Sequence, residues 1–139
     1  ALKHDQKVII QKFIDGTEIS VGVYNNDNII EALPITEIIT DNEFFDYQAK
    51  YEGKAQEITP AQISNELKEE IKKTTINIYK KMGLRGICRI DYIINKDNAF
   101  VIEINTIPGF TLESIILKQI EAAGLKLSEV FETCLLTSK

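Results

Sequence analysis

The chain has 139 residues, of which 44% are hydrophobic and 27% are charged. These values suit one folded domain with a buried core, and they exclude global disorder and a second domain of ordinary size. The 16 basic and 21 acidic residues give a net charge of −5, so neither a nucleic-acid-binding surface nor a basic membrane-binding patch is expected. Cys88 and Cys134 form no CxxC pair, so a disulfide framework and a zinc site are also unexpected. A reducing cytoplasm is the expected compartment.

The first third of the chain predicts three strands. Residues 7–14 (KVIIQKFI) are an apolar run that predicts a short buried strand. In residues 18–23 apolar and polar side chains alternate, which is typical of a half-buried strand. Residues 25–28 predict a turn by composition, and residues 29–38 predict a third strand in which Pro34 favours an edge position or a bulge.

The middle of the chain predicts a functional loop and then a helix. Residues 40–59 show no period and are rich in aromatic and charged side chains, and long stretches of this kind in a compact domain are usually functional or disordered. Apolar residues then recur at helical spacing over 67–82, and Gly83 ends the helix. Two starts are open, because residues 59–62 resemble a capping box and Ser64 is an alternative cap.

The last third predicts a hairpin followed by helices. Strands at 86–94 and 99–105 are joined by a polar turn at 95–98, and a fold about that turn brings Ile94 opposite Phe100 on the apolar face. A helix is expected over 112–123, ended by Gly124, and a last short helix after Ser128. Strands with antiparallel neighbours and flanking helices predict an α+β fold with a mostly antiparallel sheet.

The hairpin carries the polar residues with the clearest chemistry. The same register places Asp91 opposite Glu103 and Arg89 opposite Asn105. Two carboxylates directly opposite each other repel, so a cation is expected beside them. Carboxylate and amide oxygens are ligands that Mg²⁺ accepts, and Mg²⁺ in turn suggests a nucleotide. The alternative is a solvated sheet face on which Arg89 pairs with a carboxylate.

With these residues in view, the segment RID…EINTIPGFT resembles the metal-binding hairpin of ATP-grasp ligases. The YQAKY loop and the PGFTLES segment make the resemblance closer to the D-alanine–D-alanine ligase family, over nearly the whole chain. The resemblance implies the C-terminal domain of an ATP-grasp enzyme. It also implies an ADP-forming ligase that joins two D-alanines through an acyl phosphate for peptidoglycan synthesis.

The resemblance implies roles for the hairpin and for the loop after it. Asp91, Glu103 and Asn105 match the ligands of two Mg²⁺ or Mn²⁺ ions. Arg89 and the backbone N–H of Gly109 match the donors that stabilise the oxyanion of the tetrahedral intermediate.

Further matches lie outside the hairpin. Ser114 matches the serine that binds the carboxylate of the second D-alanine, and without the resemblance it would be a first-turn helix residue. Lys50 matches a lysine that reaches the transferred phosphoryl group, and Tyr51 a tyrosine that closes the first substrate site. The loop that holds both resembles a closing loop that excludes water from the acyl phosphate.

The nucleotide is expected to contact the beginning of the chain. Glu18 matches the carboxylate that holds the ribose hydroxyls. Gln11 stands where the family usually has a glutamate, which leaves backbone contacts to adenine intact and puts a side-chain role in doubt. The matching adenine-binding segment consists of Gln11, Lys12, Phe13 and Ile14.

The chain lacks the glycine-rich phosphate loop that an ATP-grasp enzyme also needs, and it begins with Ala1 rather than Met. We therefore expect residues 1–139 to be a single C-terminal domain. Its missing partner is the N-terminal part of the same polypeptide, and the full-length enzyme is expected to be a homodimer. Alone, the chain is expected to be inactive. Two alternatives remain: the C-terminal part of another ATP-grasp carboxylate–amine ligase, and a non-catalytic Mg²⁺- or nucleotide-binding module. Ser114 and the YQAKY loop argue against the first, and Arg89 and Lys50 against the second.

Overall fold

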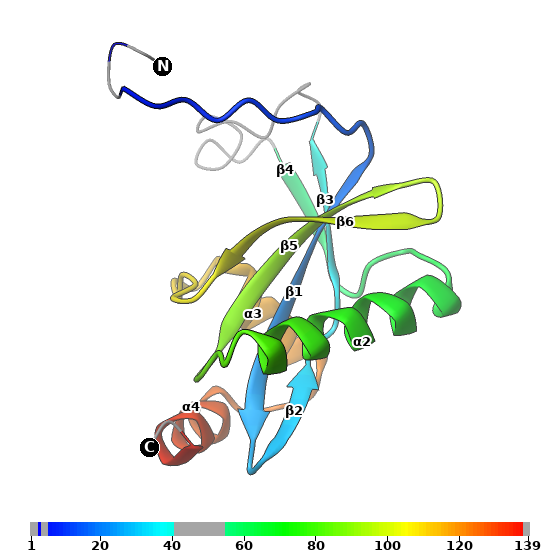
Figure 1. Cartoon of the computed structure of the whole chain (residues 1–139). Coiled ribbons are helices and arrows are strands. Elements are labelled where there is room, and N and C mark those ends of the chain that lie inside the picture. The colour runs from blue at the N-terminus through cyan, green and yellow to red at the C-terminus, as the bar shows by residue number, and fades with distance from the viewer. Residues whose placement is uncertain (1–2, 4–5, 41–54, 138–139) are drawn as a thin grey trace.

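The computed structural model describes residue 3 and residues 6–40 and 55–137, which form three layers (Figure 1). The middle layer is a six-stranded antiparallel sheet with strand order β4-β3-β1-β5-β6, in which β2 also pairs with β1. Helix α2 covers one face, and α3 lies on the opposite face with α4 beside its end. The expected α+β class is confirmed. The strands are β1 (Thr17–Asn26), β2 (Ile29–Ala32), β3 (Thr36–Thr40), β4 (Ala55–Ile58), β5 (Cys88–Asn95) and β6 (Asn98–Asn105), and the helices are α2 (Asn65–Lys81), α3 (Ile115–Ala122) and α4 (Leu127–Thr137).

Strand β1 is the centre of the sheet and is buried on both faces from Ile19 to Tyr24. The prediction that it is half-buried was therefore wrong. The alternation in its sequence is real, but α3 covers the face that carries Ser20 and Gly22, so those small residues are buried as well. Strand β5 lies beside β1 and is buried over most of its length.

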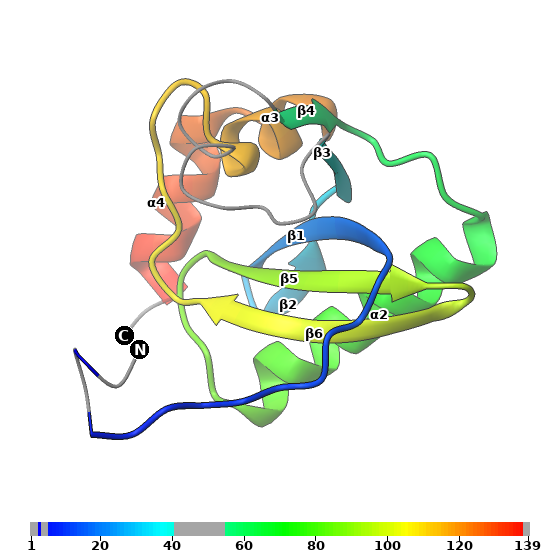
Figure 2. The same cartoon turned by 90° about the horizontal axis from the view of Figure 1, so that it is seen from above.

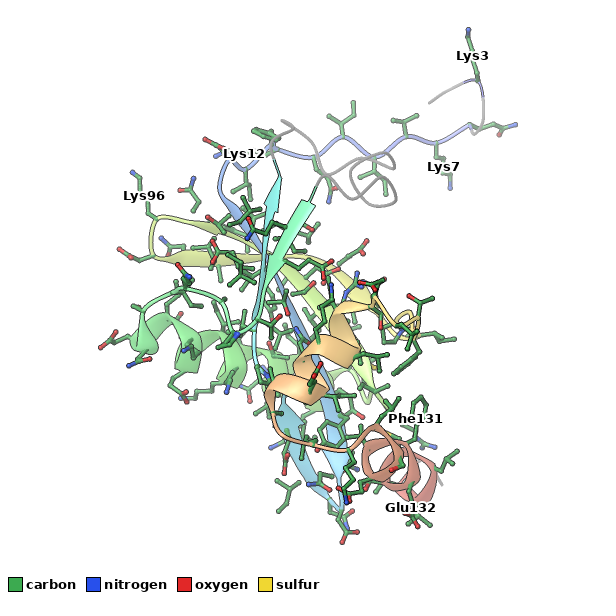
Figure 3. All side chains as sticks on the ribbon, turned by 180° about the vertical axis from the view of Figure 1, so that it is seen from behind. Lys3, Lys7, Lys12, Lys96, Phe131 and Glu132 are labelled. Atoms are coloured by element: carbon green, nitrogen blue, oxygen red, sulfur yellow. The ribbon has the colours of Figure 1, made fainter. Side chains whose placement is uncertain are left out.

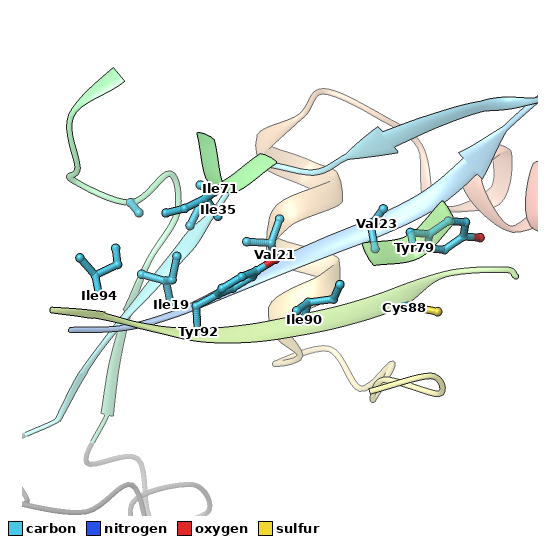
Figure 4. Packing of buried hydrophobic residues seen from close by; sticks show 11 residues of the cluster. Ile19, Val21, Val23, Ile35, Ile71, Tyr79, Cys88, Ile90, Tyr92 and Ile94 are labelled. Atoms are coloured by element: carbon cyan, nitrogen blue, oxygen red, sulfur yellow. The ribbon is translucent and has the colours of Figure 1, made fainter. Parts of the chain in front are cut away.

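An apolar core fills the space between the sheet and α2 (Figure 4). Every second residue of β1 and β5 points into it, as the period of two requires. Side chains of α2 at helical spacing meet them from the other side. The core residues drawn in Figure 4 include Ile19, Val21, Val23, Ile35, Ile71, Tyr79, Cys88, Ile90, Tyr92 and Ile94.

Helix α2 begins after Ser64, whose Oγ accepts a hydrogen bond from the backbone N–H of Leu67 at 3.2 Å. Ser64 rather than the segment 59–62 is thus the N-cap. The helix ends before Gly83, which has a φ of +61° that suits glycine. Both ends follow local signals, and the expected stop was confirmed.

The predicted strand over 29–38 is divided into β2 and β3, which pair with different parts of β1. Pro34 lies in the interruption, where its missing N–H costs no ladder hydrogen bond. The turn before β2 was predicted well: Asp27 and Asn28 have φ values of 52° and 74°, which Asn and Asp tolerate.

Residues 7–13 are extended and exposed and Ile14 is only partly buried, so the predicted buried strand was wrong. Ile9 and Ile10 are 85% and 92% exposed. The segment runs away from the sheet in Figure 1, and Lys7 lies on its far part in Figure 3. Burial of an apolar segment lowers the free energy only where another part of the protein covers it. No strand of the described sheet pairs with this segment.

The hairpin has its expected pairing only near its base. Asp91 pairs with Glu103, but an irregularity follows, so that Ile94 pairs with Ala99 and Ile93 with Phe100. The predicted contact of Ile94 with Phe100 was therefore wrong. A bulge of this kind shifts the register by one residue and is not visible in a period-two pattern. Figure 2 shows β6 beside β5 at the edge of the sheet.

Three boundaries also differ from the prediction. Helix α3 begins after Ser114, three residues beyond the expected start near Leu112, because residues 111–113 form turns. The expected loop over 40–59 ends in a strand, β4, which pairs with β3. The last helix, expected after Ser128, already begins at Leu127. Within the described residues, no helix combines the length and apolar character required to cross a bilayer.

Candidate functional site

The sheet face opposite α2 carries a cluster of polar side chains. Residues paired across antiparallel strands point to the same face, and the β1–β5–β6 registers place these residues side by side. The cluster extends from β1 in the middle of the sheet to β6 at its edge. At that edge, 52% of the Glu103 side chain is exposed. Its members are Glu18, Ser20, Arg89, Asp91, Glu103 and Asn105.

Asp91 is the buried centre of this cluster and is 4% exposed. The Arg89 guanidinium donates to it with two nitrogens, from Nε to Oδ1 at 2.9 Å and from Nη2 to Oδ2 at 2.8 Å. The Ser20 hydroxyl donates to Oδ1. A two-point pair of this kind fixes the plane of the carboxylate. The alternative prediction, Arg89 paired with a carboxylate, therefore describes part of the geometry, although the carboxylate is buried rather than solvated.

Asn105 links the two carboxylates that face each other across the hairpin. Its Nδ2 donates to Asp91 Oδ2 at 3.0 Å and to Glu103 Oε1 at 2.8 Å. The Arg89 guanidinium lies 3.9 Å from Glu103 Oε1. The expected positive compensation for the carboxylate pair is thus supplied within the protein by Arg89, with Asn105 as a second donor.

The charge of Arg89 is secured by its neighbours. Burial by itself lowers the pKa of the guanidinium, but the hydrogen bonds and charge of Asp91, followed by the charges of Glu103 and Glu18, raise the pKa above its ordinary value. Arg89 is therefore a permanent cation. Glu18 contributes to this field from β1, on the same face of the sheet.

The donor set fits a hard divalent cation. Asp91 and Glu103 offer carboxylate oxygens, and Asn105 lies between them with an amide oxygen that ligates if the amide turns. The described residues contain no group of three or more His, Cys, Asp or Glu arranged to hold a metal ion. A divalent cation at this place would have the two carboxylates as protein ligands, with the amide oxygen of Asn105 available as a third.

Ser114 stands at the N-cap of α3, but its side chain caps no backbone N–H. Its Oγ is buried and has no hydrogen-bond partner among the described residues. Buried hydroxyls are nearly always paired, so an unpaired one at a helix N-terminus is suited to an anionic ligand. Gly109 lies in the exposed loop between β6 and α3.

The remaining predicted residues are not part of the cluster. Gln11, Lys12 and Phe13 are exposed on the extended N-terminal segment, and Ile14 is partly buried. Lys50 and Tyr51 lie outside the described residues.

Two residues that touch this region were missed from the sequence. The sequence pattern identifies Ser20 only as a polar residue of a strand and assigns no role to Gln119. Gln119 is fully buried on α3 and hydrogen bonds to the backbone of β1 at Ser20 and Gly22. A glutamine on the apolar face of a helix, next to Ile115 and Ile116, was the available signal.

A family model for the C-terminus of D-ala D-ala ligases matches residues 1–136. Among curated proteins, the chain is similar to the D-alanine–D-alanine ligase of Flavobacterium johnsoniae, with 50% identity over 131 residues, or 94% of this chain and 41% of that protein. It is also similar to the enzyme of that name from Azobacteroides pseudotrichonymphae, with 51% identity over 94% of this chain and 41% of that protein. The chain thus spans about 40% of the length of these curated relatives.

Solved structures show the same likeness. The crystal structure of D-alanine–D-alanine ligase from Bacillus anthracis in complex with ATP has a TM-score of 0.74 at 29% identity, over 92% of this chain and 40% of that one. The VanG D-Ala:D-Ser ligase from Enterococcus faecalis has a TM-score of 0.73 at 29% identity, over 89% of this chain and 36% of that one.

Proposed function

The chain belongs to the D-ala D-ala ligase C-terminus family, and on that premise we propose that the whole protein is an ATP-dependent ligase that joins two D-alanines. The dipeptide serves peptidoglycan precursor synthesis, and the reaction takes place in the cytoplasm. The observation that carries this proposal is the polar cluster around Asp91 and Arg89 on one face of the sheet, followed along the chain by the unpaired hydroxyl of Ser114. The expected homodimer stays a prediction.

The proposed reaction has two steps. A carboxylate oxygen of the first D-alanine attacks the γ-phosphorus of ATP, which releases ADP and forms an acyl phosphate. The amine of the second D-alanine then attacks the acyl carbon, a tetrahedral intermediate forms, and phosphate leaves as the peptide bond is completed. Both steps build negative charge on oxygen, so fixed donors and cations near the reacting atoms lower the barrier.

Asp91, Glu103 and Asn105 are proposed to hold two Mg²⁺ or Mn²⁺ ions, which would neutralise the charge of the nucleotide phosphates. The support is their convergence: one amide already spans both carboxylates. Arg89 is proposed to stabilise the oxyanion together with the backbone N–H of Gly109. Its raised pKa keeps it charged throughout the pH range of the reaction.

The substrates and the nucleotide are proposed to bind next to this cluster. Ser114 and the first amides of α3 bind the carboxylate of the second D-alanine, which is consistent with the unused hydroxyl. Glu18 binds the ribose. Lys50 and Tyr51 close over the phosphoryl group and the first D-alanine.

The adenine is proposed to bind the backbone of the segment Gln11, Lys12, Phe13 and Ile14. This segment is extended and largely exposed, so its backbone groups are accessible to a ligand.

Product analysis on the full-length protein tests the assignment. The protein is incubated with ATP, Mg²⁺ and D-alanine, alone and with an excess of D-lactate or D-serine, and the products are separated by mass. We expect D-alanyl-D-alanine, one ADP and one phosphate per dipeptide, and little mixed product. Because one structural relative is a D-Ala:D-Ser ligase, D-serine is the more informative competitor. If a product forms only when D-lactate or D-serine is present, the assignment of D-alanine as the second substrate is wrong.

The binding-module alternative is tested on this chain alone. It contains the proposed metal ligands but no glycine-rich phosphate loop. We therefore expect weak ATP–Mg²⁺ binding by calorimetry and no ADP release with D-alanine. Micromolar or tighter affinity, near −8.2 kcal/mol, would favour a self-sufficient nucleotide-binding module.

A further inference from the structure

The carboxylate of Asp91 has no free acceptor position in this structure. Four donors surround it: Nε and Nη2 of Arg89, Nδ2 of Asn105 and the hydroxyl of Ser20. A carboxylate offers about four lone-pair positions, so all are in use. A cation that binds Asp91 must therefore displace at least one of these donors.

Three of the four donors belong to groups that have another proposed task. The guanidinium of Arg89 is assigned to the oxyanion, and Asn105 ligates metal only when its amide turns away from Asp91. Ser20 has no such second task. Its side chain is fully buried. When the other donors move, the Ser20 hydroxyl remains the fixed contact that orients the carboxylate.

Ser20 is itself held from two sides. On one side it pairs with Asp91 in the β1–β5 ladder. On the other, Nε2 of Gln119 donates to the Ser20 carbonyl at 2.9 Å and to Thr36 Oγ1 at 3.0 Å, while Oε1 accepts from the Gly22 N–H at 2.9 Å. Strand β1 pairs with β2 from Val23 onward and with β3 up to Ser20. The glutamine amide thus bonds to the backbone of β1 in the interval between these two pairings.

Glycine at position 22 leaves the space that the Gln119 amide and the Leu33 side chain occupy. A Cβ there would lie 2.7 Å from Oε1 of Gln119 and 2.7 Å from Cδ1 of Leu33. A larger residue there would displace the Gln119 amide from its hydrogen bonds to β1 unless these side chains shift. The backbone of Ser20 is thus held by Gln119 and by β5, and its hydroxyl donates to Asp91.

We propose that Ser20, fixed by Gln119, is a positioning residue that aims the carboxylate of Asp91 at a divalent cation. This rests on the proposed role of Asp91 as a metal ligand. Partners that orient a ligating carboxylate typically contribute 10- to 100-fold in metal affinity or activity. The hydroxyl has no contact with substrate in this assignment, so its effect is transmitted through Asp91 alone.

The test measures Mn²⁺ binding to the full-length protein by electron paramagnetic resonance, without substrates. Ser20→Ala should weaken Mn²⁺ binding about 10-fold or more and raise the Mg²⁺ concentration needed for half-maximal turnover by a similar factor. The KM for D-alanine should change less than twofold. Because a variant with a truncated buried residue can fail to fold, Ser20→Thr and Ser20→Val form a second pair. The two side chains have the same shape, and only threonine keeps the hydroxyl, so their difference in Mn²⁺ affinity measures the hydroxyl alone.

Thr75→Ala is the matched control. Thr75 is also fully buried, and its hydroxyl contacts the Tyr92 hydroxyl at 2.6 Å and the Ile71 carbonyl at 2.8 Å on the α2 side of the sheet. It should lower the melting temperature without weakening Mn²⁺ binding. If Thr75→Ala weakens Mn²⁺ binding as much as Ser20→Ala, general destabilisation explains both and the positioning role is wrong.

Asp91→Asn separates this inference from the proposed function. If Asp91→Asn weakens Mn²⁺ binding and Ser20→Ala, or Ser20→Val relative to Ser20→Thr, does not, the positioning role fails and the metal site stands. If Asp91→Asn leaves Mn²⁺ binding unchanged, the metal-ligand assignment itself fails, and the role of Ser20 fails with it.

Discussion

The two faces of the β1–β5 pair differ in character: one carries apolar side chains and the other carries polar and charged ones. Towards α2, the side chains of Ile19, Val21, Ile90 and Tyr92 form a closed apolar core. Towards α3, the same two strands carry charged and hydroxyl groups whose hydrogen bonds extend to the open edge at Glu103. The first face gains free energy by excluding water, whereas the second must satisfy every buried polar group it contains. Stability therefore depends mainly on one face, and the proposed chemistry belongs to the other.

The largest stability effect should come from the apolar face. Ile90 is fully buried between the sheet and α2, so Ile90→Ala should leave a cavity and lower the free energy of unfolding by about 3–4 kcal/mol. Urea denaturation of this chain measures the effect. Mn²⁺ binding by the folded full-length variant should stay within twofold of the original. A large loss of Mn²⁺ affinity would show that the two faces are not separable.

On the polar face, the two facing carboxylates should behave differently. Asp91→Asn removes the charge that pairs with the largely buried Arg89, and should lower the free energy of unfolding by about 2–3 kcal/mol. Glu103→Gln removes a half-exposed charge and should change it by less than about 0.5 kcal/mol. Denaturation without metal compares them directly, and equal effects would contradict the asymmetry.

The fold was predictable where the signal is local. The ends of α2 follow from Ser64 and Gly83, and the turn before β2 from Asp27 and Asn28. Burial was not predictable, because it depends on which distant element covers a surface. The same apolar character is buried at Ile19 and exposed at Ile10.

The candidate site divides in the same way. The pairing of Asp91 with Glu103 was predicted from a register that the turn does not have, and the bulge after Asp91 restores it. The contact of Ser20 with Asp91 joins residues 71 positions apart, and that of Gln119 with Gly22 joins residues 97 apart. Only the sheet order and the placement of α3 reveal these contacts. The bulge after Asp91 was likewise hidden, because an alternating pattern does not record one inserted residue.

The apolar face should also make stability depend on pH. Burial raises the pKa of the Cys88 thiol from 9.0 to about 11. The folded state then holds its proton more tightly than the unfolded state, so this contribution is complete below pH 9 and is lost as the pH rises from 9 to 11. The slope should be at most about 1.4 kcal/mol per pH unit.

Comparison of the original chain with Cys88→Ala isolates this effect. The variant starts from a lower stability but should lose less of it between pH 9 and 11. Tyr24, whose pKa burial raises to about 12 without a contribution from Cys88, contributes equally to both proteins and cancels in the difference. The pKa of Tyr79 is raised to about 12 by burial and then by the charge of Cys88, so the comparison is read below pH 11, where Tyr79 stays protonated in the folded state. Parallel stability curves over this range would show that the thiol does not titrate as its burial requires.

Small and contrasting effects should come from the two serines that begin the helices on opposite faces. Ser64 caps α2 through a hydrogen bond to the Leu67 N–H, so Ser64→Ala should lower the free energy of unfolding by about 1 kcal/mol. Ser114 begins α3 without such a bond, and its Oγ has no partner among the described residues. Ser114→Ala should therefore leave stability nearly unchanged, or raise it slightly by removing an unsatisfied buried hydroxyl. In the full-length protein the order should reverse: Ser114→Ala should raise the KM for the second D-alanine, and Ser64→Ala should not. A cost of about 1 kcal/mol for Ser114→Ala, with an unchanged KM, would make this serine a structural cap like Ser64.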